Sequence, residues 1–205
     1  TLSTAGATFT PGTVYVGTGA LHRWLGVDEW YTVQIAPYGQ LVAILQWNDR
    51  YGSSANDYDL FLLDYYGNTM LAESTDTQNG TGIPMEGFVY NNPTSSSVVA
   101  HLAIAQFSAT SNAKLQLFTY GKGIAYREYT VPAGSICANH HTIGEITTAA
   151  ISASDPGNDD TETFSSRGPV EHFFPAYEVR GKPDISGIDG VYVTGAGGFS
   201  SPFYG

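Results

Sequence analysis

The sequence predicts a mainly β protein: an antiparallel β-sandwich or jelly roll, followed by a C-terminal segment of strands and loops. Three observations predict it. Short runs of β-branched and aromatic residues recur between about residues 30 and 129. Each run is bounded by Gly, Asn, Asp or Pro, and no helical period separates one run from the next. Strands at this spacing are typical of two packed antiparallel sheets.

The first 131 residues divide into two expected parts. Residues 1–26 are rich in Thr and Gly, with one apolar run at 14–16, so we expect a lead-in segment or an edge strand. The sandwich domain is expected over residues 27–131. Within it, alternation of apolar and polar residues, or continuous apolar runs, predict strands at residues 31–35, 40–47, 58–63, 87–90, 97–104 and 114–120.

Residues 132–205 have a different character. Small and β-branched residues at 145–152 are typical of a buried strand in an α/β core, and a second apolar strand is expected at 190–194. The rest is rich in Gly, Pro and Ser and has few apolar runs. Because such a segment cannot build a core of its own, we expect it to need a partner surface, within the chain or beyond it.

Three stretches of this segment resemble, in order and spacing, motifs of the subtilisin-like serine proteases. They are Thr-Phe-Ser-Ser-Arg-Gly-Pro at 163–169, Gly-Lys-Pro-Asp-Ile at 181–185, and Phe-Tyr-Gly at 203–205, which is similar to the start of the catalytic-serine motif. The resemblance implies that residues 132–205 are a partial remnant of the family's α/β core. The positions that carry it are Ser165, Ser166, Arg167, Gly168, Pro169, Lys182, Pro183, Asp184 and Gly205.

The sandwich also resembles a domain of this family. Residues 45–48, 56–60 and 83–86 are similar to the β-sandwich, of the pre-peptidase C-terminal type, that some bacterial and archaeal subtilases carry inside the catalytic domain. The resemblance implies a non-catalytic portion of a secreted endopeptidase, whose partner is the remainder of the protease domain. None of the family's catalytic Asp, His and Ser, nor its oxyanion Asn, can be placed on this sequence. The chain alone is therefore expected to be inactive, with the reactive serine just past Gly205.

Composition restricts the partners and the compartment. There are 8 Lys and Arg against 19 Asp and Glu, a net charge of −11, and no basic cluster, which argues against nucleic acid because phosphate binding needs cations. The sequence contains no run of eighteen apolar residues, so no membrane span is predicted. The low charged fraction of 13%, with 14 Tyr, suits an extracellular protein. One cysteine excludes an internal disulfide.

Two alternative functions remain open at this point. Strands such as 145–152 and 190–194, without their own sheet, would add to the edge of an identical copy and build an extracellular filament. Alternatively, the sandwich is a calcium- or carbohydrate-binding module, with Trp24, Trp30 and Trp47 either stacking on sugar or packing in the core.

The calcium alternative depends on three aspartates. Asp57 and Asp59 are two residues apart on an expected strand, so they share one face, and Asp49 lies in the loop before it. Hard oxygen ligands on a loop are what Ca²⁺ prefers, although Asn and Asp also cap strand ends. Residues 155–160 form another acidic turn, interpreted as a solvated loop. Asn79-Gly80-Thr81 matches the acceptor sequence for N-glycosylation.

Overall fold

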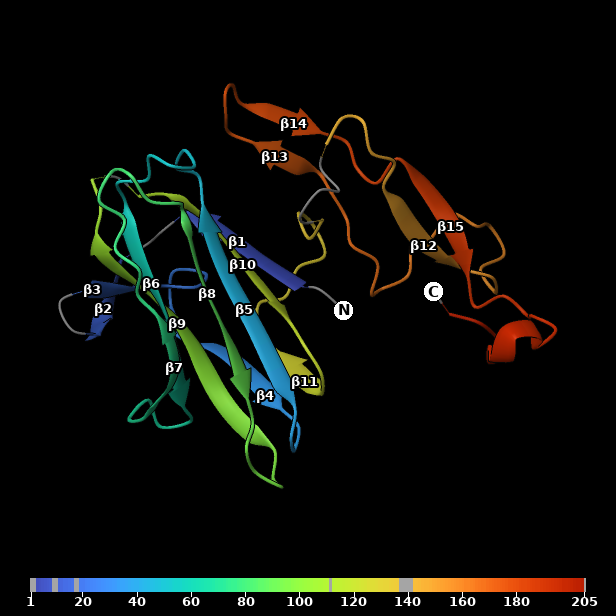
Figure 1. Cartoon of the computed structure of the whole chain (residues 1–205), viewed down its shortest axis with the longest axis horizontal. Coiled ribbons are helices and arrows are strands. Elements are labelled where there is room, and N and C mark those ends of the chain that lie inside the picture. Colours follow the sequence, from blue (N-terminus) through green and yellow to red (C-terminus); the bar gives the residue numbers. More distant parts are fainter. Residues whose placement is uncertain (1–2, 9–10, 17–18, 111, 137–141, 205) are drawn as a thin grey trace. The chain divides into compact units, whose positions relative to one another are not determined.

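The computed structural model describes residues 3–8, 11–16, 19–110, 112–136 and 142–204 (Figure 1). Strand accounts for 47% of the structure and helix for 1%, and both sheets of the sandwich are antiparallel, which confirms the predicted mainly β sandwich. The chain divides into two compact units. One comprises residues 2–131 with 173–175, and the other comprises residues 132–172 with 176–205.

The first sheet of the sandwich contains four antiparallel strands. Its order is β1 (Ser3–Thr8), β10 (Lys114–Tyr120), β5 (Gln40–Trp47) and β8 (Met85–Asn91). Because β5 lies between two neighbours, its backbone groups are paired on both sides. Apolar and polar residues alternate along it, and burial alternates in phase, since successive side chains of a strand point to opposite faces.

The second sheet is built around the long strand β9 (Val98–Ser108). One edge of β9 pairs with β4 (Tyr31–Ile35) and β3 (Gly19–His22), and the other edge pairs with β6 (Asp57–Asp64). Three further strands extend this sheet outward, namely β2 (Pro11–Val16) beside β3, β11 (Ile124–Arg127) beside β4, and β7 (Met70–Ser74) beside β6. Residues 3–8, 11–16 and 19–22 thus contribute strands to both sheets of the sandwich.

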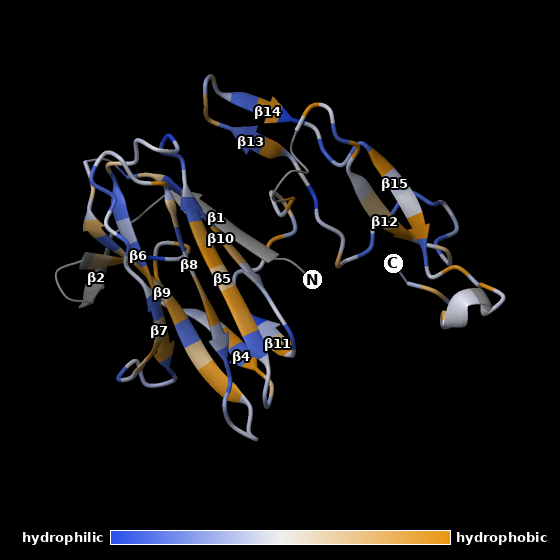
Figure 2. Cartoon of the chain, viewed as in Figure 1, coloured by the Kyte–Doolittle hydropathy of each residue, from blue (hydrophilic) through white to orange (hydrophobic). Residues whose placement is uncertain are grey.

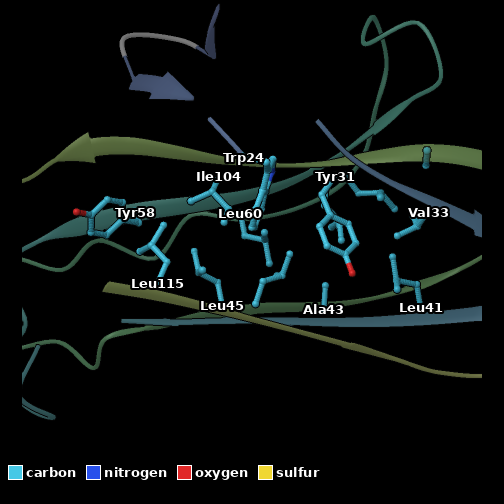
Figure 3. Packing of buried hydrophobic residues seen from close by; sticks show 14 of the residues in the cluster. Trp24, Tyr31, Val33, Leu41, Ala43, Leu45, Tyr58, Leu60, Ile104 and Leu115 are labelled. Carbon is cyan, nitrogen blue, oxygen red and sulfur yellow. The ribbon is translucent and has the colours of Figure 1, made fainter. Parts of the chain in front are cut away.

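The main core lies between the two sheets, as Figure 3 shows. Leu41, Ala43 and Leu45 of β5 face Tyr31 and other buried side chains of the second sheet. The rings of Trp47 and Tyr58 meet edge to face, 5.3 Å between centroids. Each fully buried leucine contributes about 1.5–3 kcal/mol to folding, so the sandwich has a substantial core of its own.

The other unit is built from short strand pairs. β12 (Thr148–Ser152) pairs in parallel with β15 (Ile185–Asp189), and β13 (Val170–His172) pairs antiparallel with β14 (Glu178–Arg180). A short 3-10 helix, η2 (Ala196–Gly198), follows. Among the residues that the structure describes, no helix has the length and apolar character needed to cross a membrane.

The structure corrects two expectations about the C-terminal segment. The strand predicted at residues 190–194 is wrong, because the strand is β15, which ends before Gly190, a residue with φ of 71°. Val191 makes only an isolated bridge to Phe203. The strand predicted at 145–152 begins at Thr148 and has a strand partner, since β12 and β15 pair with each other.

Candidate functional site

The first motif, at residues 163–169, is attached to β12 by its serine. Ser165 is buried, and its Oγ accepts a hydrogen bond from the backbone N–H of Ala150 at 3.1 Å. Beside it, the N–H of Glu162 donates to the Ala150 carbonyl at 2.8 Å. Ser166 follows and is half-buried. The Ser165 hydroxyl therefore provides the hydrogen-bond acceptor for one backbone N–H of β12.

Arg167 connects this motif to the start of the unit. Its backbone N–H donates to the Pro132 carbonyl at 3.2 Å and to Ser135 Oγ at 3.2 Å, and its carbonyl accepts from the Ser135 N–H at 3.1 Å. Its guanidinium donates from Nη2 to the carbonyl of Thr161 at 3.1 Å. Arg167 is thus held by backbone and side-chain hydrogen bonds within its own unit, and these fix the turn.

Gly168 and Pro169 bring the two motifs together. The N–H of Gly168 donates to the carbonyl of Lys182 at 3.1 Å. A Cβ at Gly168 would lie 2.3 Å from that same oxygen, which is a backbone atom and cannot swing away. The position needs glycine because two backbone segments meet there. Pro169 is exposed and leads into β13.

The second motif fixes the start of β15 against the start of β12. Lys182 Nζ donates to the Glu145 carbonyl at 2.7 Å and forms an ion pair with Asp184 Oδ2 at 2.6 Å; Pro183 lies between them, half-buried. Asp184 also accepts the N–H of Thr147 at 2.7 Å. The hydrogen bond from Lys182, followed by that from Thr147, lowers the pKa of Asp184, so its charge is favoured.

We expect Gly168→Ala to loosen the β12–β15 pair, with a cost of about 1–3 kcal/mol, because the added methyl meets the Lys182 carbonyl. Gly181→Ala is the matched control, since a Cβ there meets nothing within 4 Å. Hydrogen exchange of the β12 and β15 amides in the whole chain measures the difference. Equal exchange in the two variants would contradict the close approach at Gly168.

The three predicted calcium ligands are not equivalent in the structure. Asp49 lies in the loop before β6, where Oδ2 accepts from Ser54 Oγ at 2.9 Å and from the Asn56 N–H at 3.0 Å. Its Oδ1 accepts from Asn56 Nδ2 at 2.8 Å. Both oxygens of Asp49 are therefore engaged in shaping the loop, the capping role that was the alternative interpretation.

Asp57 and Asp59 both lie on β6 and are buried, with exposures of 3% and 9%. Asp57 accepts the backbone N–H of Gln78, and its Oδ1 has no hydrogen-bond partner among the described residues. Burial, followed by the charges of Asp57, Glu86 and Glu73, raises the pKa of Asp59 to about 7. Two buried carboxyl groups thus lie at this end of β6, and burial raises the pKa of both. Calcium binding there stays a prediction, which absence of heat in a calorimetric calcium titration would remove.

A buried carboxylate that the sequence analysis did not single out as a site residue, Glu86 of β8, lies in the same region. It accepts hydrogen bonds from Ser74 Oγ and from Gln78 Nε2, the latter at 2.7 Å. Burial raises the pKa of Glu86, and these hydrogen bonds oppose that effect. The sequence held one signal: alternation places Glu86 on the same face as Phe88 and Tyr90, which pack against the core.

We expect Asp59→Asn to flatten the pH dependence of unfolding. Folding raises the pKa of Asp59 from its ordinary 3.8 to about 7. The bound proton therefore stabilises the folded state fully when the pH is below the pKa of the unfolded chain. This stabilisation is lost as the pH rises through about 7. At about pH 8 the variant should be more stable than the wild type by roughly 1–2 kcal/mol. Urea unfolding in the presence of a calcium chelator measures this difference.

The control is Asp64→Asn, on the same strand. The backbone N–H of Asn68, followed by that of Thr69, lowers the pKa of Asp64, so that residue contributes stability above its unfolded pKa. The Asp64→Asn control should therefore lose stability at neutral and higher pH, whereas Asp59→Asn should gain it. An unchanged pH slope in Asp59→Asn would contradict the burial of that carboxyl.

Another acidic group lies in the turn after β12. Among the described residues, Asp155, Asp159 and Asp160 bring their carboxylate oxygens within 4.8 Å of one another. Asp155 accepts the N–H groups of Asp160 at 3.2 Å and Asp159 at 2.9 Å, and these bonds lower the pKa of Asp155. Hydrogen bonds within the turn account for the cluster, in line with the solvated loop expected here.

The tryptophans take part mainly in packing. Trp24 and Trp47 are buried in the sandwich core, so their rings are not available for stacking on sugar. Trp30 is half-buried, with its ring centroid 5.4 Å from that of His101. This arrangement favours the packing role that the sequence left open beside the sugar-stacking role.

The structure thus brings the motifs at residues 163–169 and 181–185 together in one unit, through Ser165, Gly168 and Lys182. Gly205 lies outside the described residues. Comparison of the chain with protein-family models, with curated proteins and with solved structures found no match.

Proposed function

We propose that the chain is a non-catalytic portion of a secreted subtilisin-like serine endopeptidase, with the catalytic Asp, His and Ser outside it. The observation that carries the proposal is the parallel pairing of β12 with β15. The first motif lies on the connection between these strands, and the second leads directly into β15. Both motifs therefore lie on the connection within one parallel strand pair, the kind of element from which an α/β core is built.

The exposure of this pair supports the same proposal. Parallel sheets occur almost only with both faces covered. Here Ile185 and Ile188 of β15 are about half exposed, at 56% and 49%, and Ile146, just before β12, is exposed too. Apolar residues lie along both strands (Figure 2). Two parallel strands with such exposed faces favour a larger α/β core, in which helices would cover them.

The contribution of this chain to such an enzyme would be positional. The Lys182–Asp184 ion pair and the Gly168 contact fix the backbone that runs into β15 and on toward residue 205. A serine just past Gly205 would attack the peptide carbonyl and form the acyl-enzyme, with its base and oxyanion donors also supplied from outside this chain. No residue of the chain is assigned a catalytic role.

The test is the sequence of the native gene beyond the codon for Gly205. The proposal expects Thr-Ser-x-Ala to follow immediately, as in the family motif. A reading frame that stops at Gly205, or continues without a serine there, would rule out the peptidase. Segments carrying the Asp-x-Gly and His-Gly-Thr elements upstream of Thr1 would supply the acid and the base.

A second candidate, an extracellular filament subunit, is favoured by one observation. Within the described residues β15 pairs only with β12, and its apolar side chains are exposed, so an identical copy could add a strand there. Such a head-to-tail contact does not close and builds a fibre. Negative-stain microscopy of native material that shows only monomers would exclude it.

A further inference from the structure

The loop between β7 and β8 presents one asparagine side chain to solvent from an anchored backbone. Gln78 is buried and bonds Glu86, the N–H of Gly80 donates to the Ser54 carbonyl at 2.7 Å, and the Ser54 N–H donates to the Gly82 carbonyl at 3.1 Å. Asn79, between Gln78 and Gly80, is exposed. The loop is thus tied on both sides of this residue.

The oxygen and the nitrogen of the Asn79 side-chain amide differ in their contacts among the described residues. Thr81 Oγ1 donates to Asn79 Oδ1 at 2.9 Å, so the hydroxyl engages the oxygen of the amide and leaves Nδ2 without a partner among the described residues. Thr81 is exposed as well, and a Cβ at Gly80 would meet nothing within 4 Å. Both the asparagine and the threonine of the acceptor sequence therefore lie at the surface.

We propose that Asn79 is an N-glycosylation site. Its Nδ2 forms a bond to the anomeric carbon of an oligosaccharide carried on a polyprenyl diphosphate. The bond from that carbon to the diphosphate oxygen breaks, the diphosphate leaves with the electron pair, and a base of the transferring enzyme takes one Nδ2 proton. The inference rests on the export that the proposed function implies, and it is independent of peptidase activity.

The chain contains its own comparison. Asn92-Pro93-Thr94 has the same outer residues, but proline in the middle excludes it as an acceptor. Asn92 is also only 2% exposed, and its Nδ2 donates to the carbonyls of Ala36 at 2.9 Å and Ser96 at 2.8 Å. Asn79 is therefore the single Asn-x-Ser/Thr acceptor of the chain with a residue other than proline in the middle.

To test this, the whole chain is secreted from a eukaryotic host. Glycans are released with peptide N-glycosidase in ¹⁸O-water, and the modified positions are identified by mass spectrometry. We expect ¹⁸O-labelled aspartate at position 79 in most molecules. The variants Asn79→Gln and Thr81→Ala should lower occupancy at least about tenfold, while Thr81→Ser, which keeps the hydroxyl, should retain it. Urea unfolding of each variant verifies that the sandwich is folded.

The inference is overturned if the secreted wild type carries no glycan at Asn79, or if Thr81→Ala is modified as fully as the wild type. This failure is distinct from failure of the proposed function. A chain that is glycosylated but has no serine beyond Gly205 would contradict the peptidase alone. A chain with that serine and no glycan would contradict the glycosylation site alone.

Discussion

Residues 1–131, produced alone, are expected to unfold in one cooperative transition, whereas residues 132–205 alone are expected to show none. The sandwich encloses a core between two sheets. Among its described residues, the second unit buries few large apolar side chains and leaves others, such as Tyr192 at 88% and Ile143 at 77%, exposed. Circular dichroism during a urea titration of the two fragments measures this difference.

Two outcomes of the fragment experiment would contradict this difference in stability between the two fragments. A sigmoidal transition in residues 132–205 alone would show that this unit needs no partner surface. Loss of the cooperative transition in residues 1–131, under conditions where the whole chain keeps it, would show that the sandwich is not self-sufficient. The whole chain, titrated in parallel, is the reference for the transition midpoint.

The substitution Leu60→Ala is expected to destabilise the sandwich by about 2–5 kcal/mol. Leu60 lies at the centre of β6, is 0% exposed and belongs to the core cluster between the sheets. Removing its side chain atoms loses their burial and leaves a cavity among neighbours that are held by two sheets. The midpoint and slope of urea unfolding measure the loss.

Val89→Ala is the matched control for this substitution. Val89 lies on β8 and is 55% exposed, so its truncation should change stability by less than about 0.5 kcal/mol. Equal effects of the two substitutions would mean that the interface between the sheets is not the main source of stability.

Strands with clear alternation were predictable from the sequence. Those at 31–35, 40–47 and 114–120 are confirmed with the same bounds. β7 was missed because Met-Leu-Ala-Glu-Ser contains no β-branched or aromatic residue, and only its pairing with β6 makes it a strand. β15 was placed five residues too late, because Ile-Ser-Gly-Ile-Asp alternates weakly while the Val-Tyr-Val run after it is more apolar.

The candidate site was predictable as a set of positions and not as a set of contacts. The motif residues are recognisable in order along the chain, but the hydrogen bond from Lys182 to the Glu145 carbonyl joins residues 37 positions apart. Such a contact depends on the pairing of β12 with β15, which no local pattern reports. Likewise, Asp49 could be identified as a ligand or a cap from the sequence, and only the loop geometry favours the cap.

Labelling of the native polypeptide with a serine-directed fluorophosphonate, followed by peptide mapping, tests the proposed peptidase. For the proposed peptidase we expect one labelled serine, two residues past Gly205, and no label anywhere in residues 1–205. Replacement of that serine by alanine should abolish both label and peptidase activity. Label on a serine within this chain, such as Ser165, or a native polypeptide with no reactive serine at all, would contradict it.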